Sequence, residues 1–183
     1  MSAALGSAEL AGPRERLRAA LDAEPGGLLE DIARREEASY RAVLDALAPD
    51  GAVEVAGAPF AEIWAELADW PGAVTLVVHT ADGVFETKGA VPPGTYGRGY
   101  FNVHGDSPIG GHLRADRCAA IFLVDRVLFG RRSCSVQFVN ADGDAMFKIF
   151  VGRTAAREMD PAQLARFDAL TARYRGISAD RNG

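Results

Sequence analysis

Hydrophobic residues in the first part of the chain recur every three or four positions, which is the spacing of amphipathic helices. The pattern predicts a helix beginning at Pro13, a second after the break at Pro25-Gly26-Gly27, a third with Ser39 as its N-cap, and a fourth over about residues 60–69. Pro49-Asp50-Gly51 ends the first three. The apolar positions that define these helices are Leu17, Ala20 and Leu21; Leu28, Leu29, Ile32 and Ala33; Val43, Leu44 and Leu47; and Phe60, Ile63, Trp64 and Leu67.

From Val74 to Val151 the pattern changes to short apolar or alternating runs separated by turn residues, which predicts β-strands. The predicted strands are Val74–Thr80, Val84–Gly89, Gly99–His104, Gly111–Arg114, Cys118–Arg126, Ser133–Asn140 and Ala145–Gly152. Ala141-Asp142-Gly143-Asp144 predicts a hairpin turn. Connections this short join antiparallel neighbours, because parallel strands need long crossovers. A last helix begins after Asp160, which is a favourable N-cap.

These elements predict an α+β fold in which a multi-stranded antiparallel sheet lies between a helical N-terminal segment and a C-terminal helix. We expect residues 1–50 to form the helical segment, either as part of the same domain or as a small appendage. Residues 51–183 then form the α+β domain. A chain of 183 residues with 48% hydrophobic positions is long enough to bury a core of its own.

Composition excludes several classes of function. The net charge of -5 and pI of about 5.2 argue against a general nucleic-acid or anionic-membrane binder. The N-terminus lacks a basic region followed by an apolar run, and no stretch is long enough to cross a bilayer, so we expect a cytoplasmic protein with no membrane partner. Cys118 and Cys134 are expected to be buried thiols, with a cross-strand disulfide as the alternative.

The second and third predicted helices also have the spacing of a helix-turn-helix, so a DNA-binding regulator is one alternative. The candidate reading helix offers Arg41, but Asp45 and Asp50 follow it. Few cations would therefore face phosphate, although counterion release supplies most of the affinity in such complexes. A packing or docking module fits this segment better, and we expect no nucleic-acid partner.

The most distinctive stretch runs from Arg98 to Asp106 and is closed by Gly110-Gly111-His112-Leu113. If it is a strand, Tyr100, Asn102 and His104 point to one side. A phenol and imidazoles on one wall suit a ferric iron held in a flat apolar macrocycle, which takes an oxygen or imidazole axial ligand. The plain alternative is a half-buried hairpin whose Tyr100 hydroxyl meets water.

Other candidate binding residues lie outside this stretch. His79 ends a predicted strand on the same face as Thr75 and Val77, where it is either structural or open to a ligand in a cleft. The cations Arg98, Arg131, Arg132, Lys148 and Arg153 are candidates for pairing with ligand carboxylates, with solvated strand-end charges as the alternative. The strand at residues 145–151 has two largely apolar faces, which indicates burial on both sides or contact with a ligand or second subunit. No zinc-ligand spacing, phosphate loop, nucleophile elbow or catalytic triad is evident.

Linked motifs over roughly residues 60–155 resemble the intracellular haem-utilisation proteins of the HutX/ChuX type. The motifs are Ile63-Trp64 with Trp70, Leu76-Val77-Val78-His79-Thr80-Ala81-Asp82, Gly99-Tyr100-Phe101-Asn102, Gly111-His112-Leu113, and Ala145-Met146-Phe147-Lys148-Ile149-Phe150-Val151-Gly152-Arg153. The resemblance implies a saddle-like antiparallel sheet flanked by helices, like one half of the tandem HemS/ChuS haem-handling proteins. It also implies a homodimer that binds ferric haem and passes it to a cytoplasmic haem-degrading enzyme.

Carried over by motif, Tyr100 becomes the candidate axial ligand to ferric haem, and His79 and His112 become the family histidines. Arg98, Arg132 and Lys148 are candidates for the haem propionates. Some family members carry further histidines just before the Gly-Tyr-Phe-Asn motif, where this chain has Tyr96-Gly97-Arg98. Ligation from those positions is lost here, or Tyr96 takes it over, and His104 has no assigned role.

The leading hypothesis is therefore a haem-binding and haem-transfer protein with no catalytic residue of its own. The alternative from another class is an enzyme, a haem-degrading oxygenase or reductase that uses the same site. The sequence contains no flavin or nicotinamide site, so a partner would have to supply its electrons. A DNA-binding regulator is the third hypothesis.

Overall fold

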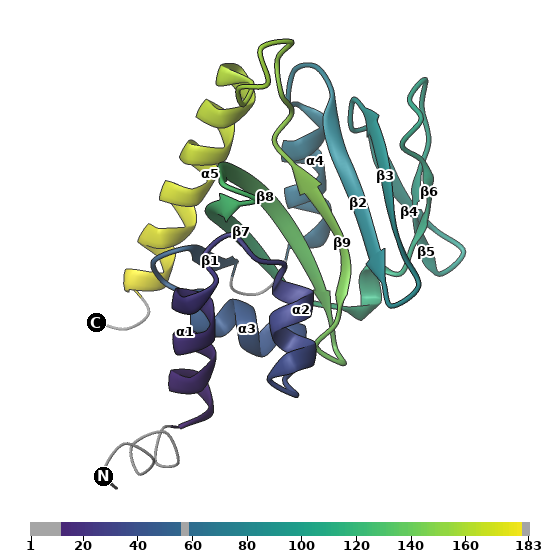
Figure 1. Cartoon of the computed structure of the whole chain (residues 1–183). Helices are drawn as coiled ribbons and strands as arrows, with labels where there is room; N and C mark the ends of the chain where they lie inside the picture. Colours follow the sequence, from purple (N-terminus) through teal and green to yellow (C-terminus); the bar gives the residue numbers. More distant parts are fainter. Residues whose placement is uncertain (1–11, 56–58, 181–183) are drawn as a thin grey trace, which may run out of the picture.

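The computed structural model describes residues 12–55 and 59–180 (Figure 1). The predicted helices and strands are present in the predicted order, and Ala52–Val55 and Gly94–Gly97 form two further strands that were not predicted. The helices are α1 (Pro13–Ala23), α2 (Leu29–Arg35), α3 (Tyr40–Leu47), α4 (Phe60–Ala68) and α5 (Pro161–Asp180), with a short 3-10 turn at Ala115–Arg117. The strands are β1 (Ala52–Val55), β2 (Val74–Thr80), β3 (Gly83–Gly89), β4 (Gly94–Gly97), β5 (Tyr100–Val103), β6 (Gly111–Leu113), β7 (Cys118–Leu128), β8 (Arg131–Asn140) and β9 (Ala145–Phe150).

Both predicted N-caps are confirmed. The Ser39 hydroxyl accepts a hydrogen bond from the Ala42 amide at 3.1 Å. The Asp160 carboxylate accepts from the amide of Ala162 at 2.9 Å and from that of Gln163 at 3.0 Å. These bonds satisfy amides of the first turn that have no partner within the helix.

The strands form two antiparallel sheets, which confirms the α+β prediction. The large sheet has six strands in the order β1-β7-β8-β9-β2-β3, and the small sheet has three in the order β4-β5-β6. Long hairpins hold the large sheet together: β7 pairs with β8 from Cys118 against Asn140 to Leu128 against Arg131. The predicted turn between β8 and β9 is present, with Gly143 at φ +88°, a conformation that favours glycine.

The large sheet is covered on both faces. On one face lie α4, α5 and the small sheet, which share what we call the α4–α5 core. On the other face lie α1, α2 and α3, which share the N-terminal core with that face (Figure 1). Buried members of the α4–α5 core include Trp64, Phe101, Val103, Ile121, Leu123, Val136, Phe138, Ile149 and Phe167. Buried members of the N-terminal core include Leu21, Ile32, Val43, Leu44, Phe122, Val124 and Val139. The predicted helical segment thus packs directly on the sheet.

The small sheet is fixed to α4 by aromatic contacts. The ring of Phe101 meets those of Phe60 and Trp64 at centroid distances of 5.2 and 5.8 Å, in edge-to-face geometry. The Trp64 indole donates a hydrogen bond of 2.8 Å to the Pro92 carbonyl just before β4. With Phe101 turned inward, Tyr100 and Asn102 face away from the core.

Other sequence predictions have clear outcomes. The two cysteines are free, and burial raises the pKa of the Cys118 thiol to about 11 and that of Cys134 to about 12. One face of strand β9 packs in the α4–α5 core through Phe147 and Ile149, whereas the other face, with Lys148 and Phe150, lines a cavity, which agrees with the alternative of a face available to a ligand. Within the described residues, no helix combines the length and hydrophobicity that a bilayer crossing requires.

Candidate functional site

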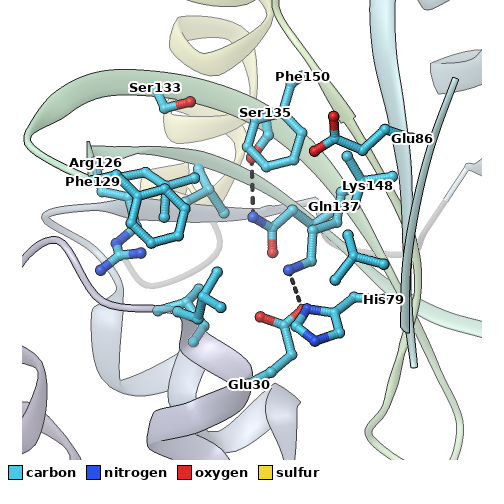
Figure 2. Close-up of a pocket in the computed structure, with 16 residues that line it drawn as sticks. Glu30, His79, Glu86, Arg126, Phe129, Ser133, Ser135, Gln137, Lys148 and Phe150 are labelled. Atoms are coloured by element: carbon cyan, nitrogen blue, oxygen red, sulfur yellow. Dashed lines mark hydrogen bonds and ion pairs between the residues drawn. The ribbon is translucent and has the colours of Figure 1, made fainter. Parts of the chain in front are cut away.

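An open cavity of about 330 Å³ lies between the start of α2 and the large sheet, on the face of the N-terminal core (Figure 2). Its volume is at the lower end of the range for small-molecule pockets. The wall is mostly apolar and comprises Leu28, Leu29, Val77, Val84, Val124, Leu128, Phe129 and Phe150. Phe129 at the tip of the β7–β8 hairpin is 73% exposed, so the cavity has an apolar rim. Such a surface suits a flat or elongated apolar ligand.

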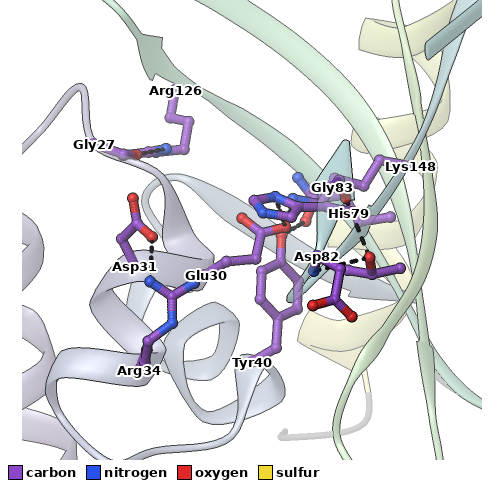
Figure 3. Close-up of polar contacts among 12 residues, drawn as sticks. Gly27, Glu30, Asp31, Arg34, Tyr40, His79, Asp82, Gly83, Arg126 and Lys148 are labelled. Atoms are coloured by element: carbon purple, nitrogen blue, oxygen red, sulfur yellow. Dashed lines mark hydrogen bonds and ion pairs between the residues drawn. The ribbon is translucent and has the colours of Figure 1, made fainter. Parts of the chain in front are cut away.

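Three charged or titratable side chains meet at one end of the cavity (Figures 2 and 3). Lys148 lies opposite Val77 in the register of β9 and β2, so its side chain emerges on the same face as His79. The Lys148 ammonium forms an ion pair with Glu30 of α2, and His79 Nδ1 lies 3.2 Å from the same carboxylate oxygen. Burial lowers the pKa of the Lys148 ammonium, and the attraction of Glu30 opposes that shift only in part.

A second set of polar contacts lies beneath this end of the cavity. The Tyr40 hydroxyl donates a hydrogen bond of 2.6 Å to the Gln137 side-chain oxygen, and the Gln137 amide donates to the Ser135 hydroxyl at 3.0 Å. The Lys148 ammonium stands 4.8 Å from the centre of the Tyr40 ring, a cation–π distance. Burial, reinforced by the charge of Glu30, raises the pKa of the Tyr40 hydroxyl well above its usual value. Tyr40 is therefore a neutral donor rather than a phenolate.

A different cluster occupies the outer face of the small sheet. Tyr100 is 42% exposed, and its ring centre lies 6.0 Å from that of His112. The His104 ring lies 5.7 Å from His112 on the other side. Arg114 stands 6.0 Å from the Tyr100 ring centre. Within the described part of the chain, the Tyr100 hydroxyl makes no hydrogen bond, so it is open to an incoming ligand.

Asn102 fixes the orientation of His112 in this cluster. The Asn102 amide nitrogen donates to the carbonyl of Gly97 at 3.0 Å and faces that of Thr95 at 3.3 Å. Its oxygen therefore accepts from His112 Nδ1, 2.6 Å away. This arrangement places the His112 proton on Nδ1 and leaves the Nε2 lone pair free, the form of imidazole that ligates metals.

The structure divides the predicted site residues into two groups. Tyr100, His112 and Asn102 lie together with His104, while His79 and Lys148 lie together in the cavity. The small sheet packs on the α4–α5 core, whereas the cavity opens on the opposite face of the large sheet. Within one protomer, the two groups are thus separated by the sheet.

The two predicted arginines have other surroundings. Arg98 is exposed at the β4–β5 turn with φ 54°. Arg132 makes two hydrogen bonds, of 2.9 and 2.6 Å, to the carboxylate of Asp125, and lies outside both groups. That pairing raises the pKa of Arg132 and lowers the pKa of Asp125. Lys148, predicted as a partner for a ligand carboxylate, is paired with the protein's own Glu30.

Sequence reasoning missed Glu30, Tyr40 and Gln137. The available signal for Glu30 was its position at the start of the predicted second helix, directly after Leu29 of the apolar stripe that faces the core. Gln137 is 3% exposed within a strand of apolar neighbours. A polar residue in such a strand needs a buried partner, but the pattern does not show which one.

The comparisons with known proteins agree with this structure. The family model for haem utilisation ChuX/HutX matches residues 53–170. The intracellular heme transport protein HutX of Vibrio cholerae is 32% identical over 156 residues, covering 85% of this chain and 80% of that protein. A solved structure of the heme binding protein ChuX matches with a TM-score of 0.78 and 34% identity, over 87% of this chain and 99% of that one.

The likeness to the ChuS fold that the resemblance implied is also found. The heme degrading enzyme ChuS of Escherichia coli O157:H7 matches 88% of this chain with a TM-score of 0.73 at 19% identity, but only 47% of its own length is covered. This likeness shows the fold alone, in which the present chain corresponds to about half of the longer protein. The family model, the curated relative and the fold together show that the chain belongs to the ChuX/HutX family of haem-utilisation proteins.

Proposed function

We propose that this protein binds ferric haem in the cytoplasm and transfers it to a haem-degrading enzyme. The observation that carries the proposal is the exposed Tyr100 hydroxyl beside His112, whose Nε2 is left free by Asn102. Phenol and imidazole are both axial ligands of haem iron. The family membership and the names of the relatives, a heme transport protein and a heme binding protein, support the same function.

The proposed roles follow from ligand chemistry. Tyr100 is the candidate axial ligand, since a phenolate is a hard oxygen donor that favours ferric over ferrous iron. Reduction of the iron would weaken that bond, which suits release as well as capture. The apolar cavity provides a wall for the macrocycle, and His79 at its end is the second candidate ligand. Arg114, which stands 6.0 Å from the Tyr100 ring centre and pairs with Asp116, and Arg98, two residues before Tyr100 in the chain, are candidates for the propionates.

We further propose that a complete haem site needs two copies of the chain. Tyr100 and His79 lie on opposite sides of the large sheet, so one haem does not reach both within one protomer. In a symmetric dimer, the cavity of one copy and the Tyr100 face of the other can meet, and every such contact then occurs twice.

Haem transfer is favoured over haem degradation by the exposure of Tyr100. An oxygenase has to exclude water from its reactive intermediates. A carrier instead needs a ligand that its partner can reach and replace. Haem-loaded protein supplied with a reductant and oxygen should keep its Soret band, and loss of that band with formation of a bilin would establish the enzyme instead.

Absorbance titration of the purified protein with ferric haem tests the proposal. We expect saturable binding by the wild type, and we expect Tyr100→Phe to change the high-spin charge-transfer bands and the Soret position. His79→Ala and His112→Ala show which imidazole takes part. Tyr96→Phe tests the alternative tyrosine ligand, which is also exposed and lies on the neighbouring strand β4, and we expect this variant to keep the wild-type spectrum. No saturable binding by the wild type would reject the function.

Sedimentation velocity tests the two-copy site. We expect a dimer in the haem-loaded state, and we expect a mixture of Tyr100→Phe and His79→Ala chains to recover part of the wild-type spectrum. Each mixed dimer would hold one intact site. A loaded monomer with the wild-type spectrum would contradict the two-copy site while leaving haem binding intact.

A further inference from the structure

Glu30 reaches the cavity from outside the part of the chain that defines the family. The family model begins at residue 53, whereas Glu30 lies in α2 of the N-terminal helical segment. Its side chain is nevertheless 14% exposed and lies between the sheet residues His79 and Lys148 (Figure 3). A carboxylate from the N-terminal segment therefore forms part of the cavity end.

The contact with Glu30 favours one of the two nitrogens of His79 as the site of the proton. His79 Nδ1 lies 3.2 Å from the Glu30 oxygen, and an ionised carboxylate repels a nitrogen lone pair at that distance and attracts an N–H group, so the proton is favoured on Nδ1. A neutral His79 then bears no proton on Nε2. A metal-ligating histidine in proteins almost always has a partner of this kind at its other nitrogen, which fixes the ring and raises its basicity as a ligand.

The surroundings hold this carboxylate in one position. Lys148, 7% exposed, binds the same oxygen, and its ammonium also rests 4.8 Å from the Tyr40 ring centre. The second oxygen of Glu30 is buried and has no hydrogen-bond partner among the described residues. Glu30 and His79 also line a neighbouring cavity of about 340 Å³, so their contact forms the wall between two hollows.

We propose that Glu30 is a positioning residue for His79: it holds the imidazole in its Nδ1-protonated form, with Nε2 left free for a ligand in the cavity. The N-terminal helices are then part of the haem site and not merely a cover for the sheet. This inference rests on the proposed function insofar as His79 faces haem. The state of the His79 ring in the free protein does not depend on haem and can be tested alone.

Nitrogen-15 NMR of the histidine rings in the haem-free protein gives that test. The chain has three histidines, so His79→Ala identifies the signals of His79. At mildly alkaline pH, where imidazoles are neutral, we expect long-range proton–nitrogen spectra of the wild type to show the Nδ1-protonated form. Glu30→Gln should shift His79 toward the Nε2-protonated form, because an amide can also donate to Nδ1.

Asp31→Asn is the matched control. It removes the same charge from the next residue of α2, whose carboxylate pairs with Arg34 at 2.8 Å and not with His79. We expect its His79 signals to match the wild type. If Glu30→Gln fails to fold because Lys148 is left unpaired, Glu30→Gln combined with Lys148→Gln removes both charges and permits the same measurement. An Nε2-protonated His79 in the wild type, or spectra unchanged in the Glu30 variants, would overturn the proposal.

Haem titration adds a second readout. Loss of such a supporting partner typically weakens metal binding about 10-fold to 100-fold, and we expect Glu30→Gln to weaken haem binding by about that factor. The loss should vanish in the His79→Ala background, because Glu30 acts through His79. Independent, additive losses would overturn the positioning role while haem binding itself stands. A wild type that binds no haem would reject the proposed function, and the NMR result would still decide the role of Glu30.

Discussion

The ion pair between Glu30 and Lys148 allows a quantitative prediction about stability. The two side chains are 14% and 7% exposed, so neither charge is fully hydrated in the folded state. Removing one partner of such a pair leaves a buried charge without compensation, which typically costs about 3–5 kcal/mol. Glu30→Gln should therefore lower the free energy of unfolding by about that amount. Lys148→Met should cost less, since His79 Nδ1 still lies 3.2 Å from the carboxylate.

Urea unfolding followed by circular dichroism measures this difference. With a slope of about 2 kcal/mol per molar urea, the Glu30→Gln midpoint should fall by roughly 1.5–2.5 M. The double variant Glu30→Gln/Lys148→Met should lose less than the sum of the single variants, because replacing both charges leaves neither unpaired. Asp31→Asn, which breaks only an exposed pair with Arg34, should stay within about 0.5 kcal/mol of the wild type.

The result that refutes this reasoning is additivity. If the two single losses sum to the double loss within about 0.5 kcal/mol, Glu30 and Lys148 do not stabilise each other. Equal losses for Glu30→Gln and Asp31→Asn would likewise show that burial of the pair has no energetic consequence. In either case, there would be no reason to conclude that Lys148 holds the Glu30 carboxylate in position beside His79.

Three further predictions concern the same fold. Tyr40→Phe leaves the buried oxygen of Gln137 without its donor and should lower the free energy of unfolding by about 1–3 kcal/mol in the same urea assay. Burial lowers the pKa of Lys148, so the unfolded chain holds that proton more tightly than the folded one. The free energy of unfolding of the wild type, measured relative to Lys148→Met, should therefore rise as the pH increases toward the ordinary lysine pKa of about 10.4. A difference that does not change with pH would contradict the lowered pKa. Gly94→Ala places a Cβ 2.1 Å from the Phe101 ring, so it should cost about 1–3 kcal/mol in thermal or urea unfolding. A neutral result would mean that the Phe101 ring can shift without loss of packing.

Local patterns in the sequence were sufficient to predict most of the elements. The N-caps Ser39 and Asp160 were predictable because each side chain bonds an amide within the next three residues, and the structure contains both bonds. The strand β4 was missed because Gly94 and Gly97 at its ends are typical of loops. Its glycine at position 94 is explained only by a distant residue, since the Phe101 ring occupies the space that a side chain would fill. Close approach between strands leaves no periodic trace in the sequence.

The site was predictable residue by residue but not as an arrangement. Alternation correctly placed His79 on the face of Val77, and it placed Tyr100 with Asn102, yet each statement holds only within one strand. The packing of the small sheet and of the N-terminal helices decides on which side of the large sheet each of these residues lies. The sequence therefore suggested one ligand set where the protomer has two separated groups.

Lys148 shows what the sequence can predict about the site and what it cannot. A lone ammonium on an otherwise apolar strand face needs a counter-charge, so its sequence context alone demands an acidic partner. That partner is Glu30, which lies 118 positions earlier and is brought to the sheet by burial of the apolar stripe on α2. The same packing that satisfies Lys148 also brings a carboxylate to His79. The N-terminal helices therefore belong to the site because buried Lys148 needs the carboxylate of Glu30. The same carboxylate is the one that we propose positions the imidazole of His79 for haem.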